Sequence, residues 1–182
     1  MKTCLVTKVR NEGIYLLEWI AYHKLLGFDD IVIVSNDLDD KSDLLLSALH
    51  SAGLVCWRDV THLPLNGDSI GARAYRQAWS IISDTPHDWI MELDADEFLH
   101  LNGRNLKDFL ADFPDSDAIV FNWMNFGCSK HIHFQPGRLV TERFSWALPA
   151  NRIHKKEVKS ICRKQVVNRI AAHSPHFKNR PI

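Results

Sequence analysis

Short apolar segments alternate with helical segments along the first two thirds of this chain. We expect strands at residues 4–9, 31–34, 54–57, 89–93 and 118–123. Between them, apolar residues recur at helical spacing over residues 14–26, about 40–52, 69–82 and 106–113. Strands that are apolar throughout and separated by helices predict an α/β fold with a mainly parallel central sheet and helices on both faces.

The composition fits one globular domain. The chain has 182 residues, of which 46% are hydrophobic and 24% are charged. Basic and acidic residues number 22 each, so no net positive charge attracts nucleic acid. The four cysteines form no close pair, which argues against a zinc knuckle or a disulfide framework. The first apolar run is too short for a signal peptide and no run could span a bilayer, so we expect a cytoplasmic protein.

The fourth predicted strand ends in a cluster of acids. Asp94, Asp96 and Glu97 follow the apolar residues 89–93 within four positions. Carboxylates at this spacing repel one another unless a cation or a bound proton relieves them. At neutral pH a hard divalent cation that prefers oxygen ligands would do so. The cluster therefore predicts a Mg²⁺ or Mn²⁺ site, with a solvated acidic turn as the alternative.

Polar residues follow three of the predicted strands. They occupy residues 10–12, 35–40 and 94–97. Ligands of parallel α/β sheets bind beyond the carboxyl ends of the strands, so these three loops predict one site. The chain has neither a Gly-x-Gly-x-x-Gly turn nor a P-loop, so a diphosphate here needs a metal and side chains to meet its charge.

Five segments, in order, resemble nucleotide-sugar glycosyltransferases of the GT-A fold, in the family-two-like group that merges with family 92. They are residues 8–12, 17–27, 94–98 (Asp-Ala-Asp-Glu-Phe), 123–127 (Trp-Met-Asn-Phe-Gly) and 142–144 (Glu-Arg-Phe). The chain departs from the family pattern at residues 128–130 and by lacking a serine in residues 36–40. The resemblance implies one GT-A domain over 1–182. Its nucleotide-sugar-binding half would be 1–100, and its acceptor-side half, 101–182, would be shorter than in related enzymes.

The resemblance also implies roles for the acids. Asp96 would coordinate Mn²⁺ or Mg²⁺, and Asp94 would share the ion or contact ribose or the donor sugar. Residues that alternate as they leave a strand can straddle one ion, which agrees with this assignment. His173 would be a third metal ligand, with His176 as the alternative.

Further residues complete the predicted site, each with a structural alternative. The nucleoside pocket would be lined by Arg10, Asn11, Glu12, Asn36, Asp37 and Asp39, which are also residue types that form turns and helix caps. On the helix at 69–82, Arg73 and Gln77 would reach the diphosphate or the donor sugar, unless they lie on a solvated face. Trp123 would stack on a sugar or pack in the core. Glu142 would be the general base, with a structural salt bridge as the alternative.

These roles imply a metal-dependent, inverting glycosyltransferase. It would transfer a sugar from a nucleotide-diphosphate sugar to a glycan, a lipid-linked acceptor or another hydroxyl, in cell-surface polysaccharide or lipopolysaccharide synthesis. It would bind no nucleic acid and associate with a membrane at most peripherally, at the inner face. The alternatives are a non-catalytic nucleotide- or sugar-binding relic of such an enzyme and an Asp-x-Asp phosphotransferase.

Overall fold

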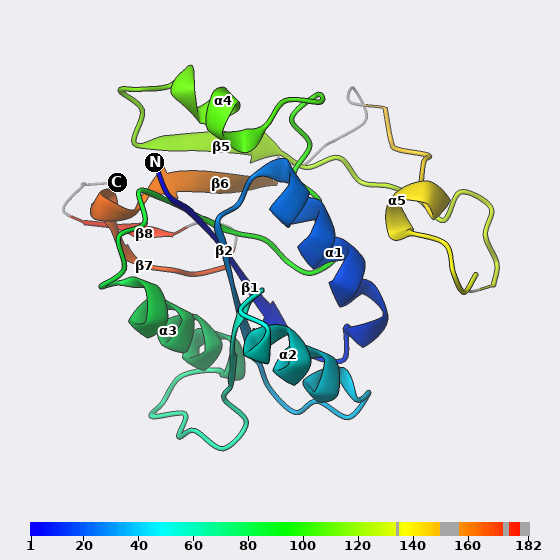
Figure 1. Ribbon diagram of the computed structural model, residues 1–182, viewed down its shortest axis with the longest axis horizontal. Helices are drawn as coiled ribbons and strands as arrows, with labels where there is room; N and C mark the ends of the chain where they lie inside the picture. The colour runs from blue at the N-terminus through cyan, green and yellow to red at the C-terminus, as the bar shows by residue number, and fades with distance from the viewer. Residues whose placement is uncertain (134, 150–156, 173–174, 179–182) are drawn as a thin grey trace.

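The computed structural model describes residues 1–133, 135–149, 157–172 and 175–178. Its centre is a six-stranded sheet in the order β3-β2-β1-β4-β6-β5 (Figure 1). The strands are β1 (Thr3–Val9), β2 (Asp30–Ser35), β3 (Cys56–Asp59), β4 (Trp89–Glu92), β5 (Ala118–Asn122) and β6 (Val158–Arg163). Strands β3, β2, β1 and β4 are parallel, and β6 is antiparallel to both β4 and β5.

Helices cover both faces of this sheet (Figure 1). They are α1 (Gly13–Leu26), α2 (Ser42–Ser51), α3 (Ile70–Ile82) and α4 (Leu106–Ala111). The short α5 (Val140–Arg143) lies apart from the sheet, beyond α1 (Figure 1). A 3-10 turn (Lys164–Val166) leads to a two-stranded sheet of β7 (Val167–Arg169) and β8 (His176–Phe177). The predicted α/β architecture, a mainly parallel sheet with helices on both faces, is confirmed. None of the described helices is long and apolar enough to cross a membrane.

Strand β1 divides the core into two clusters. Leu5 and Val9 belong to the cluster under α1, α2 and α4, whereas Cys4 and Val6 belong to the cluster under α3. All four side chains are buried. Because successive strand residues point to opposite faces, a strand covered on both sides must be apolar throughout. This explains the successive apolar residues Cys4, Leu5 and Val6 in the predicted strand.

Strand β6 is the main departure from the predicted elements. It inserts between β4 and β5, so the sheet is mixed at this end. Its sequence, Val-Lys-Ser-Ile-Cys-Arg, carries three polar residues and lacks the apolar signature of the other central strands. Lys159, on this strand, is only 2% exposed.

The loops after β1 and β2 are fastened to each other at the carboxyl ends of the strands. Asn11 Oδ1 accepts a hydrogen bond from Asp39 N at 2.9 Å, and Asp40 Oδ2 accepts one from Gly13 N at 2.9 Å. The carboxylate of Asp40 also accepts from Ser42 N, at the start of α2. The first residues of both helices therefore donate to one shared carboxylate.

Helix α1 also forms hydrogen bonds to the chain at residues 97–99. Trp19 Nε1 donates to Glu97 O at 2.8 Å, and Tyr22 Oη donates to Leu99 O at 3.0 Å. His23 Nε2 accepts from Leu99 N at 3.3 Å, while its Nδ1 lies 2.9 Å from Trp19 O. These contacts, which we call the α1 clamp (Trp19, Tyr22 and His23), fix the backbone of residues 97–99 against the helix.

Gly13 is expected to tolerate no side chain. A Cβ atom there would lie 2.9 Å from Asp40 Oδ2 and 3.0 Å from Ser42 Cβ, so Gly13→Ala forces the start of α2 away. We expect a loss of about 1 to 3 kcal/mol in the free energy of unfolding, measured by urea denaturation. The matched control is Gly71→Ala in α3, where the nearest atom, Lys8 Cε, is 4.0 Å away. That variant should gain about 0.5 to 1 kcal/mol. Equal changes in the free energy of unfolding for Gly13→Ala and Gly71→Ala would contradict the close approach of α1 and α2.

His23 is expected to make the fold sensitive to acid. Burial lowers the pKa of His23 from 6.5 to about 4, although the hydrogen bond to Trp19 O opposes this. The unfolded chain therefore binds more protons between these two values, and stability falls as the pH falls through that window. The contribution amounts to about 3 kcal/mol.

The test compares urea unfolding of wild type and His23→Gln as a function of pH. The variant should be less stable at neutral pH, and its stability deficit should shrink by about 3 kcal/mol as the pH falls from 6.5 to about 4. His100→Gln, at an exposed position, should keep the wild-type slope. Parallel curves for wild type and His23→Gln would rule out a buried neutral imidazole.

Candidate functional site

Three polar loops meet at the carboxyl ends of β1, β2 and β4. Asn11 joins the first loop to the second through Asp39. Burial raises the pKa of Glu12, and the negative charges of Asp96 and Asp40 raise it further. The carboxylates of all three loops thus lie within electrostatic reach of one another, and this edge of the sheet carries excess negative charge.

The acids after β4 form a tight turn, here called the acid turn (residues 94–97). Glu97 N donates to Asp94 O at 3.1 Å. In return, Glu97 Oε2 accepts from Asp94 N at 2.8 Å. Glu97 therefore closes the turn, and the exposed Asp96 lies at its tip.

A buried lysine neutralises the inner side of the acid turn. Lys159 Nζ lies 2.8 Å from Glu92 Oε2, 3.0 Å from Asp94 Oδ2 and 3.1 Å from Glu97 Oε2. Glu92 is also buried, and its Oε1 accepts from Tyr75 Oη at 2.7 Å. A cation was expected to relieve the repulsion in this cluster, and the structure supplies an ammonium from β6 on its buried side.

The charge state of Lys159 follows from its partners. Burial alone would lower the pKa of the ammonium, but the carboxylates of Glu92, Glu97 and Asp94 outweigh burial and raise it above its ordinary value. Lys159 is thus positively charged at any physiological pH. Sequence reasoning missed it, although a lysine between Val158 and Ile161 in a strand-like segment is a usable signal for a buried, paired cation.

The carboxylates of Asp94 and Asp96 differ in the contacts that they already make within the protein. Asp94 Oδ2 contacts Lys159, and Asp94 Oδ1 lies 3.6 Å from Lys8 Nζ. Across the described ranges, no hydrogen bond or ion pair to the Asp96 carboxylate is found. No three histidine, cysteine or acidic side chains converge on a metal-binding point within the described part of the chain. An exposed carboxylate beside a shared one still fits Mg²⁺, which proteins often hold by one or two carboxylates while phosphates and water complete the shell.

The loop after β2 presents the predicted nucleoside-binding residues. Asn36 is 9% exposed, and its Nδ2 donates to Asp37 Oδ2 at 3.0 Å. Thr61 Oγ1 accepts from Asp37 N at 2.8 Å. Asn11 and Asp37 adopt left-handed backbone conformations, with φ of 59° and 48°. Asp37, Asp39 and the neighbouring Arg10 are exposed, so this part of the edge is open to a ligand.

The two residues predicted on α3 differ in their surroundings. Arg73 is 5% exposed, and its Nη1 donates to the carbonyl oxygens of Thr61 and Leu63. Its guanidinium therefore braces the loop after β3 and does not lie on an open surface. Gln77, one turn later, is half-buried.

The predicted acceptor-side residues lie on a segment that protrudes beside α1 (Figure 1). Trp123 is half-buried, and its backbone N donates to Glu157 O at 3.0 Å. Glu142 is exposed in α5, and its Oε2 accepts from Leu139 N at 3.2 Å, which caps that helix. His173, the predicted third metal ligand, lies outside the described residues.

One carboxylate docks this protruding segment onto α1. Glu18 accepts hydrogen bonds from Val140 N at 2.6 Å, Thr141 N at 3.0 Å and Thr141 Oγ1 at 2.9 Å. The buried Arg143 lies over the Tyr15 ring, 5.8 Å from its centroid. Helix α1 thus contacts both the acid turn and the segment that carries Glu142.

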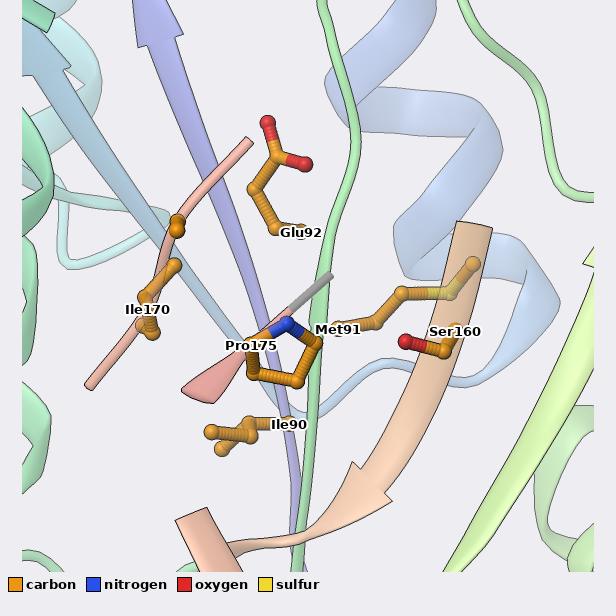
Figure 2. Close-up of a pocket in the computed structure, with 7 residues that line it drawn as sticks. Ile90, Met91, Glu92, Ser160, Ile170 and Pro175 are labelled. Carbon is orange, nitrogen blue, oxygen red and sulfur yellow. The ribbon is translucent and has the colours of Figure 1, made fainter. Parts of the chain in front are cut away.

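A small cavity lies between β4, β6 and the segment before β8. It measures about 10 Å³, close to the space that one water needs. Figure 2 shows its lining of Ile90, Met91, Glu92, Ser160, Ile170, Ala171 and Pro175. A nucleotide cannot enter it, so the open edge beside Asp96 is the better candidate for ligand binding.

Comparisons with known proteins agree with the sequence resemblance. The model of "Glycosyltransferase family 92" matches residues 4–181. A family 92 protein of Ricinus communis is 28% identical over 163 residues, which are 86% of this chain and 28% of that protein. A family 92 protein of Oryza sativa subsp. japonica is 27% identical over 169 residues, which are 91% of this chain and 27% of that protein. The chain thus spans little more than a quarter of the length of these relatives.

Solved structures give weaker likenesses. Residues 1–349 of S. aureus TarS align over 91% of this chain and 48% of that chain, with 15% identity and a TM-score of 0.49. HddC from Yersinia pseudotuberculosis aligns over 90% of this chain and 77% of that chain, with 13% identity and a TM-score of 0.44. The predicted kinship is confirmed by the family match, which covers almost every residue: this chain belongs to glycosyltransferase family 92.

Proposed function

We propose that this domain is a glycosyltransferase that moves a sugar from a nucleotide-diphosphate sugar to a hydroxyl acceptor. The observation that carries the proposal is the exposed carboxylate of Asp96 on a rigid acid turn, beside two polar loops at one edge of the sheet. Membership of glycosyltransferase family 92 supports glycosyl transfer as the reaction. It does not favour the Asp-x-Asp phosphotransferase.

The proposed metal ion is Mn²⁺ or Mg²⁺, held by Asp96 with a contribution from Asp94. When bound, the ion supplies Lewis-acid stabilisation of the departing diphosphate. Ion pairs with Lys159 and Lys8 orient the Asp94 carboxylate, which can accept a hydrogen bond from a hydroxyl of ribose or of the donor sugar. Asp96 at the exposed tip is the ligand with free oxygen atoms.

The proposed nucleoside pocket lies between the loops after β1 and β2. Asn11 and Asp39 hold these loops together, and Glu12, Asn36 and Asp37 add amide and carboxylate groups to the same edge. Such groups can hydrogen-bond a base edge and ribose hydroxyls. Arg10, which is exposed beside them, adds a positive charge for a phosphate.

The proposed acceptor side is the segment with Trp123 and Glu142. An exposed carboxylate on α5 is available to remove a proton from an acceptor hydroxyl, as an inverting transfer requires. The docking of α5 on Glu18 supports this, because α1 begins at the donor edge and also holds the acid turn. Trp123 offers an aromatic face for a sugar. A glycan or lipid-linked acceptor of cell-surface polysaccharide synthesis, used at the inner face of a membrane, completes the proposal.

The first experiment is a calorimetric titration with UDP and with GDP, each with and without Mn²⁺. Wild type should bind one of them in a metal-dependent way, and Asp96→Ala should lose that dependence with a drop in affinity of at least about tenfold. The control is Asp115→Ala, which removes an exposed carboxylate before β5, remote from the acid turn. It should bind as wild type does.

Turnover separates the enzyme from the non-catalytic relic. A mass-spectrometric assay for free nucleotide, with the matching nucleotide sugars as substrates, should detect slow hydrolysis or transfer by wild type. It should detect none above background for Asp96→Ala. Metal-dependent binding without any turnover would favour the relic. The absence of nucleotide binding in the presence of Mn²⁺ would overturn the donor site.

A further inference from the structure

We propose that Lys159 is a positioning residue of the acid turn, whose ammonium holds the buried side of the cluster and so directs a divalent cation to Asp96 at the exposed tip. This inference rests on the proposed function, because it concerns the same metal. It assigns a role to a residue of β6 that neither the motifs nor the family resemblance pointed to.

The geometry around Lys159 is that of an occupied cation site. Oxygen atoms from Glu92, Asp94 and Glu97 converge on one nitrogen at 2.8–3.1 Å. Mg²⁺ takes oxygen ligands at about 2.1 Å, so the same three carboxylates would need to close in by less than about 1 Å to hold a metal instead. They are spaced for an ammonium, in keeping with the lack of a three-ligand metal cluster in the part of the chain that is described.

The remaining contacts anchor the carboxylates on this side. Glu92 Oε1 accepts from Tyr75 Oη, and Glu97 Oε2 accepts from Asp94 N as well as from Lys159. Lys159 itself is 2% exposed, so it cannot turn outward to contact a substrate. Its role is therefore indirect: it fixes Asp94 and keeps a second cation out of the interior.

This arrangement has a consequence for the metal. Like charges repel strongly at a few ångström in a partly buried site. An ion on the buried side is excluded by the ammonium, and an ion at Asp96 has few protein ligands. Removal of the positive charge should leave three converging carboxylates that attract a divalent cation on their own. A purely structural lysine predicts the opposite, because its loss would loosen the turn and weaken metal binding.

The test is the affinity for Mn²⁺ alone, measured from the electron paramagnetic resonance signal of free Mn²⁺ at neutral pH. Lys159→Met should bind Mn²⁺ at least about tenfold more tightly than wild type. The gain should survive in Lys159→Met/Asp96→Ala, because the ion then sits on the buried side. Lys159→Arg keeps the charge and should behave as wild type. The matched control, Lys107→Met, removes a lysine paired with Asp29 on another part of the surface and should leave Mn²⁺ binding unchanged.

Circular dichroism establishes which variants fold. If Lys159→Met does not, Glu92→Gln/Lys159→Met removes one buried negative charge with the positive one, an exchange that proteins often tolerate. It should still bind Mn²⁺ more tightly than wild type. If the folded variants that lack the ammonium, Lys159→Met or Glu92→Gln/Lys159→Met, bind Mn²⁺ no more tightly than wild type, the inference is overturned. Titration of wild type with UDP and GDP plus Mn²⁺ is a separate readout, so failure of the proposed function would be seen there and not confused with this result.

Discussion

The ion cluster around Lys159 joins the sheet to the edge that carries the acid turn. Its members come from the end of β4, the acid turn and β6, and the residues that it links are up to 67 positions apart in sequence. Removing one partner from a buried charge cluster typically costs about 3 to 5 kcal/mol, because the others are left uncompensated. The antiparallel strand that makes the sheet mixed is thus also the strand that completes the charge balance of the acid turn, and fold and site depend on the same contacts.

Much of this architecture could be predicted from local sequence. The apolar runs at β1, β2 and β4 and the helical spacing of α1 and α3 follow from burial on one or two faces, and these elements appear close to their predicted bounds. Strand β6 could not be predicted in this way. Its polar residues are satisfied by tertiary partners, Lys159 by three carboxylates and Arg163 by the carbonyl oxygens of Pro114 and Ser116. Only the assembled fold provides those partners.

The residues of the candidate site also fall into those that local sequence predicts and those that depend on tertiary contacts. The acids at residues 94–97 and the loops after β1 and β2 were found from their positions at strand ends, because a parallel sheet brings such ends together. Arg73 was expected to face a ligand or solvent, yet its side chain is buried and its guanidinium donates to two backbone carbonyls. The α1 clamp was missed because Trp19, Tyr22 and His23 read as ordinary helix residues, and their partners lie more than 70 positions along the chain.

The hydrogen bonds of the α1 clamp reach residues 97–99 through main-chain atoms: the carbonyl oxygens of Glu97 and Leu99 and the Leu99 amide. The rings of Tyr22 and His23 also pack against the ring of Phe98, with centroids 5.1 Å and 5.9 Å apart. The hydrogen bonds do not depend on which side chains the acid turn carries. Evolution could therefore exchange the acids of the turn while the helix keeps the path of the backbone the same. In a diverging family, helix α1 would preserve the backbone path at this edge, while the residues of the acid turn would determine its chemical groups.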